Sequence, residues 1–276
     1  MKKREKEKKH RRLKNWIKGV IIVYCGIGIA LYYLQEKLIF HPEQLAPDYQ
    51  YKFGTPFEEV FVPFSKNDST SIVRFFTEAQ EKKGVVLYFH GNRGNINRYA
   101  KYAGNFTKNG YEVWMIDYPG YGKSTGKISE KYLYNQASEL YKLAANKFSS
   151  DSIIIYGKSL GSGPASWLGY MKKCKKLILE TPYYSLTDLL QRYAIIYPAS
   201  VISAFKFPVY KYVSETKNPV IIFHGTADRV IPYKASEQLK QILKSTDEFI
   251  TIEDGSHNNL NDFPLFHQKL DSVLNL

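Results

Sequence analysis

Short apolar runs recur along the chain from residue 57 onward, and longer amphipathic stretches separate them. Residues 57–64 and 70–78 flank the turn-forming segment Ser-Lys-Asn-Asp-Ser, so they are predicted to pair as antiparallel strands. Later runs are rich in Val, Ile and Leu and alternate little, which is typical of strands buried on both faces of a parallel sheet. They span residues 84–91, 111–118, 151–157, 175–180 and 218–225.

Helical patterns lie between these strands. They cover residues near 95–109, 129–147, 159–172 and 233–244, and a last strand near 248–253 precedes a helix near 262–275. This alternation predicts an α/β fold with a mostly parallel central sheet and helices on both faces. Residues 183–214 interrupt the rhythm with many aromatic residues and no clear strand, so we interpret them as a small cap inserted between two strands.

The N-terminus follows a different pattern. Residues 19–35 contain no charged side chain, and Trp16 helps to extend this run to about the 20 residues that a bilayer core requires. A cleaved signal peptide would be followed by a small-x-small site, which the next residues do not provide. We therefore predict three parts: a basic tail over 1–15, one transmembrane anchor over 16–35 and a folded domain over 36–276.

The net charge of +13 is concentrated at one end of the chain. Residues 1–18 carry ten Lys and Arg against two Glu, whereas the rest carries 29 basic and 24 acidic residues. A nucleic-acid binder would need basic and aromatic residues interleaved on its folded part, so this class is disfavoured. By the positive-inside rule the tail is predicted to stay in the cytoplasm, with the folded domain on the extracytoplasmic side.

The cysteines and histidines predict neither a disulfide framework nor a metal site. Cys25 lies in the predicted anchor and Cys174 in a lysine-rich stretch, so the two are poorly placed to pair. No cluster of His and Cys in the sequence has metal-ligand spacing. We expect no metal and no cofactor.

The strand over 151–157 leads into Gly-Lys-Ser-Leu-Gly, residues 157–161. A phosphate-binding P-loop would need a glycine at position 152, where the chain has Ser152, and the Gly-Lys-Ser at 122–124 fails the same test. The letters also fit the nucleophile elbow G-x-S-x-G, in which a serine occupies a tight turn between a strand and a helix. Ser159 is therefore a candidate nucleophile, and the alternative is an ordinary small residue in a glycine-rich turn.

A serine nucleophile needs a histidine base and a carboxylate that orients this base. Where the elbow occurs, the order along the chain is Ser, acid, His. His257 follows the last predicted strand and Asp228 follows the strand before it, so these two are our candidates. Asp254 is the second candidate for the acid, whereas Asp188 opens the cap. The alternatives are a surface-loop histidine and a solvated turn aspartate.

Two backbone N–H groups should stabilise an oxyanion beside such a serine. One belongs to Leu160, the residue after the nucleophile, and the other to the loop after residues 84–91. Gly91 permits a close turn there, and the Asn92 N–H is the donor that we expect. This loop can also cap the next helix, and the two roles are compatible.

Six segments occur together in the order of the α/β-hydrolase superfamily: YFHGNRGN, DYPGYGKSTG, YGKSLGSGPA, ETPYYS, HGTADRVIP and GSHNN. Residues 35–276 resemble more closely its Bem46-like, ABHD17-like and ABHD13-like branch, whose members often carry a short N-terminal membrane segment. The resemblance implies an α/β-hydrolase fold. It also implies a triad of Ser159, Asp228 and His257 with oxyanion donors at Asn92 and Leu160.

This resemblance makes a membrane-anchored serine hydrolase the expected function. Its substrate would be a small-molecule or lipid-like ester or thioester, cleaved through an acyl-enzyme. A peptidase or amidase of the serine aminopeptidase type and a catalytically silent binding protein stay open as alternatives, because one fold hosts many functions. Lys158 and Arg93 depart from the usual residues and are expected to add positive charge at the rim. The cap aromatics either roof an acyl pocket or pack into the core: Tyr183, Tyr184, Tyr193, Tyr197, Phe205 and Phe207.

Overall fold

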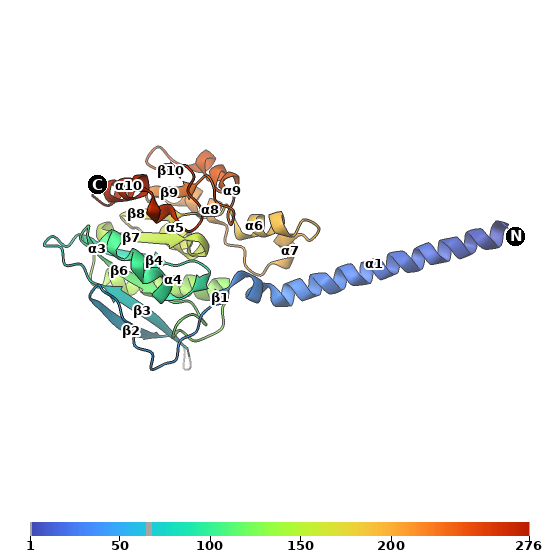
Figure 1. Cartoon of the computed structure of the whole chain (residues 1–276), viewed down its shortest axis with the longest axis horizontal. Helices are drawn as coiled ribbons and strands as arrows, with labels where there is room; N and C mark the ends of the chain where they lie inside the picture. Colours follow the sequence, from blue (N-terminus) through green and yellow to red (C-terminus); the bar gives the residue numbers. More distant parts are fainter. Residues whose placement is uncertain (1, 65–67, 276) are drawn as a thin grey trace.

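The computed structural model describes residues 2–64 and 68–275. A long helix, α1 (Lys2–Ile39), projects away from an α/β domain and carries the N-terminus at its far end (Figure 1). Within the described residues it is the one helix long and apolar enough to cross a bilayer, and its apolar window is not buried against the domain. The predicted tail and anchor are thus parts of one continuous helix that ends at Ile39.

Eight strands form the central sheet in the order β10-β9-β8-β7-β4-β6-β3-β2. They are β2 (Phe57–Pro63), β3 (Ser69–Phe75), β4 (Gly84–Phe89), β6 (Tyr111–Ile116), β7 (Ile153–Lys158), β8 (Lys176–Glu180), β9 (Val220–Gly225) and β10 (Glu248–Ile252). Neighbours from β10 to β6 run parallel, and β3 runs antiparallel to β6 and to β2. This confirms the mostly parallel sheet and the antiparallel pair that the sequence predicts. Residues 65–67 of the predicted turn lie outside the described residues.

Side chains alternate between the two faces of the sheet and meet a helical layer on each. On β4, Val85 and Leu87 belong to one core and Val86 and Tyr88 to the other. The first core is covered by α4 (Glu130–Ala145), α5 (Ser162–Met171) and α8 (Val209–Glu215). The second is covered by α2 (Ile96–Tyr99), α3 (Gly104–Thr107) and α10 (Pro264–Asn275). Apolar residues on both faces explain why the strands read as continuous hydrophobic runs.

Two predicted helices are broken. The pattern near 95–109 folds as α2, a 3-10 turn at Ala100–Tyr102, and α3. Gly104 stands at the second break, where a residue without a side chain adds little to helix stability. The pattern near 233–244 folds as α9 (Tyr233–Glu237) and a 3-10 turn at Gln238–Ile242.

Three helices lie in the chain between β8 and β9. Two of them, α6 (Leu186–Tyr193) and α7 (Ala199–Ile202), stand beside the domain-proximal part of α1 (Figure 1). The third, α8, packs against α5 in the helical layer. We use the name cap below for residues 183–214, as predicted, and its part next to α1 consists of α6 and α7.

Candidate active site

Ser159 occupies a strained turn between β7 and α5. Its backbone φ is +51°, a left-handed conformation that costs a non-glycine residue about 1–3 kcal/mol. The flanking glycines make this turn possible, because a Cβ atom on Gly157 would lie 2.6 Å from the Ala165 Cβ atom, and one on Gly161 would lie 2.1 Å from the Phe89 carbonyl oxygen. The backbone conformation therefore matches the sharp strand-to-helix turn that the G-x-S-x-G motif predicts, with the serine at its apex.

The structure brings Ser159, His257 and Asp228 together from three separate loops. His257 Nε2 lies 2.9 Å from Ser159 Oγ, and His257 Nδ1 lies 2.8 Å from Asp228 Oδ2. These loops follow β7, β9 and β10, whose carboxyl ends meet at one edge of the parallel sheet. All three residues are buried, with at most 8% of each exposed. This arrangement suits proton transfer from a hydroxyl to an imidazole that a carboxylate orients.

Asp228 keeps its charge although it is buried. Burial raises the pKa of this carboxyl, but hydrogen bonds from His224 and His257 outweigh it and lower the pKa well below its usual range. The backbone N–H groups of Val230 and Ile231 both donate to Asp228 Oδ1 at 2.8 Å. The carboxylate is thus fixed in place and stays ionised at neutral pH.

Two further histidines hold the site's loops, and the sequence did not reveal their roles. His224 Nε2 lies 2.9 Å from the Ile231 carbonyl oxygen and 3.3 Å from Asp228 Oδ2, so it positions the acid loop. His90 Nδ1 donates to the Gly91 carbonyl at 2.7 Å, and its Nε2 lies 3.2 Å from Asp117 Oδ1. Burial raises the pKa of Asp117, although His90 opposes that rise. The His90–Asp117 pair thereby fixes the start of the loop that carries Asn92.

Asn92 and Leu160, the expected oxyanion donors, line one cavity together with Ser159. Leu160 lies in the first turn of a 3-10 helix, where backbone N–H groups lack an intrahelical acceptor. The segment after α1 holds the Asn92 loop, because the Asn92 carbonyl accepts from His41 N at 2.9 Å and Asn92 Nδ2 donates to the Ile39 carbonyl at 3.0 Å. In addition, β1 (His41–Pro42) pairs in parallel with β5 (Arg93–Gly94).

The cavity at Ser159 has two chemically different sides. One side has a volume of about 270 Å³ and a largely apolar wall. Its apolar lining comprises Leu38, Ile39, Leu160, Tyr183, Leu186, Leu189, Leu190, Tyr193, Val230 and Ile231. The other side, of about 190 Å³, is polar and includes Arg93, Arg98, His257 and Asn258. An amphiphilic substrate fits such a pair of pockets with its reacting bond at Ser159.

Lys158 lines the polar side of the cavity, but its charge is paired there and is not exposed at the rim as the sequence suggested. It is buried, and its Nζ atom donates to Glu180, which also accepts from the Tyr156 hydroxyl. Lys158 and Glu180 are register partners on β7 and β8, which explains the pairing. Arg93 is exposed and does lie at the polar side of the cavity.

The other sequence candidates lie apart from these contacts. Asp254 is exposed, and its backbone N–H donates to Thr226 Oγ1 at 2.9 Å. Asp188 forms an ion pair with Arg192 at 3.1 Å. Of the cap aromatics, Phe205, Phe207 and Tyr183 belong to the core. Tyr183 and the exposed Tyr193 line the cavity. Over residues 2–64 and 68–275, no group of three or more His, Cys, Asp or Glu side chains is placed to hold a metal ion.

Comparisons with known proteins found similar sequences and similar folds. A family model described as serine aminopeptidase, S33, matches residues 80–206. Alpha/beta hydrolase domain-containing protein 17C from Mus musculus is 25% identical over 221 residues, which cover 78% of this chain and 67% of that protein. The protein of the same name from Xenopus tropicalis is 27% identical over 69% of this chain and 61% of its own.

The chain has the α/β-hydrolase fold and is similar in sequence to members of that superfamily. Its fold is shared by an esterase from Pyrococcus furiosus, with a TM-score of 0.64 and 17% identity over 86% of this chain and 97% of that one. It is also shared by acetyl xylan esterase 1 from Thermoanaerobacterium, with a TM-score of 0.63 and 16% identity. That match covers 88% of this chain and 92% of the esterase chain. The match to the family model lies within the α/β domain, to which α1 is attached.

Proposed function

We propose that this α/β-hydrolase is a membrane-anchored serine esterase that cleaves carboxylic esters or thioesters. The single observation that carries the proposal is the continuous contact from Ser159 Oγ through the His257 imidazole to Asp228, with the serine on its strained elbow. A serine is a weak nucleophile unless a neighbouring base removes its proton. Here the base lies within hydrogen-bond distance of the hydroxyl.

The proposed reaction has two halves. Ser159 Oγ attacks the acyl carbon while His257 Nε2 takes the hydroxyl proton, and the N–H groups of Asn92 and Leu160 stabilise the oxyanion. The intermediate collapses to an acyl-enzyme, and His257 gives the proton to the departing alcohol or thiol. Water then attacks the acyl-enzyme with the same base, which releases the acid and restores Ser159. Asp228 holds the imidazole and stabilises its cation throughout.

The two-sided cavity favours an ester or thioester over a peptide with a free amino terminus. An aminopeptidase needs an acidic group to bind the substrate's ammonium. The described residues that line the two sides of the cavity include arginines but no Asp or Glu. Amide hydrolysis is nevertheless the second candidate, because the matching family model is described as a serine aminopeptidase.

The membrane part of the proposal rests on α1. A stretch of about 20 apolar residues can span the roughly 30 Å hydrocarbon core, and the exposed apolar window of this helix meets that need. The lysine-rich end of α1 favours the cytoplasmic side, which places the hydrolase domain across the membrane.

Replacing Ser159 by alanine tests the proposed function. We expect Ser159→Ala to lower kcat/KM for a short ester on the order of a millionfold, and to abolish labelling by a fluorophosphonate probe. Ser162→Ala is the matched control, because Ser162 is buried in the same turn and its Oγ faces the Gly157 carbonyl at 3.5 Å. Labelling of Ser159→Ala as strong as that of the native chain would contradict the assignment. An unlabelled native chain would favour a silent binding protein instead.

A further inference from the structure

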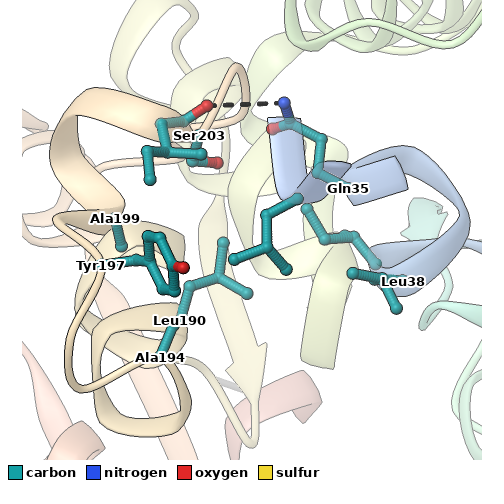
Figure 2. A pocket seen from close by; sticks show the side chains of 10 residues that line it. Gln35, Leu38, Leu190, Ala194, Tyr197, Ala199 and Ser203 are labelled. Atoms are coloured by element: carbon teal, nitrogen blue, oxygen red, sulfur yellow. Dashed lines mark hydrogen bonds between the residues drawn. The ribbon is translucent and has the colours of Figure 1, made fainter. Parts of the chain in front are cut away.

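An apolar gap separates the end of α1 from the cap. Figure 2 shows Gln35 and Leu38 of α1 facing Leu190, Ala194, Tyr197 and Ala199 across it. The gap has a volume of about 80 Å³, and Leu31, Ile39, Ile202 and Ser203 complete its lining. No acidic or basic side chain is among these described residues, so the gap suits hydrocarbon and not a polar ligand.

This gap adjoins the cavity at Ser159. Leu38, Ile39 and Leu190 line both of them. At its other end the gap meets Tyr197, which also borders an open apolar groove along α1 formed with Trp16, Val20, Val23, Tyr24 and Ile27. Three adjoining apolar surfaces therefore follow one another from the exposed part of α1 to the candidate nucleophile.

Specific contacts hold α1 against the cap on both sides of the gap. The rings of Tyr24 and Tyr197 stack with their centroids 4.6 Å apart, and the Tyr197 hydroxyl donates to the Tyr24 carbonyl at 3.1 Å. Closer to the domain, Ala204 N donates to Gln35 Oε1 at 2.7 Å. These residues of α1 recur at helical spacing, so one face of the helix meets the cap. The gap thus lies between two sets of contacts that join α1 to the cap.

The tip of the cap exposes apolar side chains beside the same part of α1. Ile195, Ile196 and Val201 are 81%, 70% and 77% exposed. Exposed clusters of large apolar residues mark sites that contact a partner or a membrane. Since the Tyr24 hydroxyl donates to the Ile196 carbonyl at 2.9 Å, the tip lies at the level of the span of α1 that the proposed function places in lipid. The exposed apolar side chains of the tip are therefore suited to contact with lipid.

We propose that the long acyl chain of a bilayer amphiphile reaches Ser159 from the membrane, through the gap between α1 and the cap. The inference rests on the proposed function, and it makes α1 a wall of the acyl site in addition to an anchor. The ester or thioester carbonyl lies at Ser159, the chain lies along Leu190, Ala194 and Leu31, and the polar head group lies on the side of Arg93. Burial of methylenes along this wall is the source of chain-length preference.

The test is to fill the gap in the full-length protein, reconstituted in phosphatidylcholine vesicles. We expect Ala194→Trp to lower kcat/KM for p-nitrophenyl palmitate about tenfold or more, because displacing a few buried methylenes accounts for that factor. Hydrolysis of p-nitrophenyl acetate should stay within about twofold, since its acyl group needs only the cavity at Ser159. Leu31→Trp fills the gap from the α1 side and should act in the same way.

Ile29→Trp is the matched control, because Ile29 is 59% exposed on α1 and lines neither the gap nor the cavity. It should leave the ratio of palmitate to acetate hydrolysis unchanged. An unchanged ratio in both gap-filling variants would overturn the acyl route. Equal losses on both esters in both variants would also overturn it, because a filled route must discriminate by chain length.

A binding readout separates this inference from the proposed function. A diazirine analogue of palmitic acid in the vesicles should cross-link Ser159→Ala protein at the gap residues Leu190 and Ala194, and Leu31→Trp should lose most of that labelling. Labelling of the outer face of α1 is expected from bulk lipid and does not count. Cross-linking in the gap without any hydrolysis by the native chain would refute the esterase while supporting the acyl site. Hydrolysis of the acetate ester without cross-linking in the gap would refute the acyl site alone.

Discussion

Asp228 shows how single side chains set the chemistry of this site. It is buried, yet two histidines and two backbone N–H groups surround its carboxylate. Because its folded-state pKa is lowered, its charge contributes stability above the ordinary carboxyl pKa of about 3.9. That contribution is lost only as the pH falls below this value toward the folded-state pKa. The proposed orienting charge is therefore present across the neutral range.

Asparagine in place of Asp228 should uncouple the imidazole from its orienting charge. We expect Asp228→Asn to lower kcat for a short ester on the order of ten-thousandfold, because the amide can donate to Nδ1 and so favours the wrong tautomer of His257. The matched control is Asp254→Asn. Asp254 has a φ of +56°, which asparagine tolerates well, so this variant should stay near the native rate. A larger loss in Asp254→Asn than in Asp228→Asn would contradict the choice of acid.

The sequence predicted the residues that stand at strand ends but not those that support them. The sequence alone was enough to propose Ser159, Asp228 and His257, because it shows both their order along the chain and their positions directly after apolar runs. The pairing of Lys158 with Glu180 could not, since it depends on β7 and β8 being neighbours in a particular register. Lys158 therefore looked like a charge at the rim, although it is buried and paired.

At the scale of elements, the two-residue strands β1 and β5 matter more than their length suggests. They join the end of α1 to the loop that carries the Asn92 N–H. Strands of two residues are too short to show an alternation of hydrophobic and polar positions, so they cannot be predicted from the sequence pattern. The structure also buries Ile39 and Phe40, at the end of α1 and just after it, against the domain.

Two truncations separate the anchor from this support. A chain that begins at Glu36 keeps Ile39 and His41, so its rate on p-nitrophenyl acetate should stay within about twofold of the full-length rate. A chain that begins at Leu45 loses the contacts to Asn92, and we expect its rate to fall about a hundredfold, the effect of losing one oxyanion donor. Equal rates for the two truncated chains would contradict the supporting role of β1.

Loss of Ile39 and Phe40 also removes part of the core, so the shorter chain's folding must be followed separately. Thermal unfolding monitored by tryptophan fluorescence reports on this directly. Asn92→Ala in the full-length protein offers a milder change, because it removes the hydrogen bond to the Ile39 carbonyl and leaves the backbone N–H in place. This variant should lower the acetate rate about tenfold, an effect set by looser positioning of the donor.

At the scale of the whole molecule, the site lies where α1 meets the domain. The helix ends at Ile39, and both Leu38 and Ile39 line the cavity that holds Ser159. Its domain-proximal part also packs along the cap, so α1, the cap and the cavity adjoin one another (Figure 1). The sequence predicted these parts separately. It could not show their contact, because residues near 24–39 and 190–204 are far apart in the chain and carry no shared motif.

The mode of membrane attachment separates a spanning α1 from a basic tail on lipid head groups. We expect the full-length protein to stay with membranes in high salt and to be released only by detergent. Apolar burial of a spanning helix is not screened by salt, whereas attraction between a lysine-rich tail and anionic head groups is screened within about 10 Å at 0.1 M. The chain that begins at Glu36 is the control and should be soluble without detergent at any salt concentration. Release of the full-length protein by salt alone would refute the spanning helix.

Protease accessibility then tests the side on which the domain lies. Ten positive charges before residue 19 should keep the tail in the cytoplasm, so protease added outside intact cells is expected to remove the hydrolase domain. In inside-out vesicles the same protease should cut only the tail and leave a protected domain with full acetate activity. The reverse pattern would refute the orientation while leaving the spanning helix intact. The acyl route survives either orientation, since α1 and the cap enter the bilayer together on whichever side the domain stands.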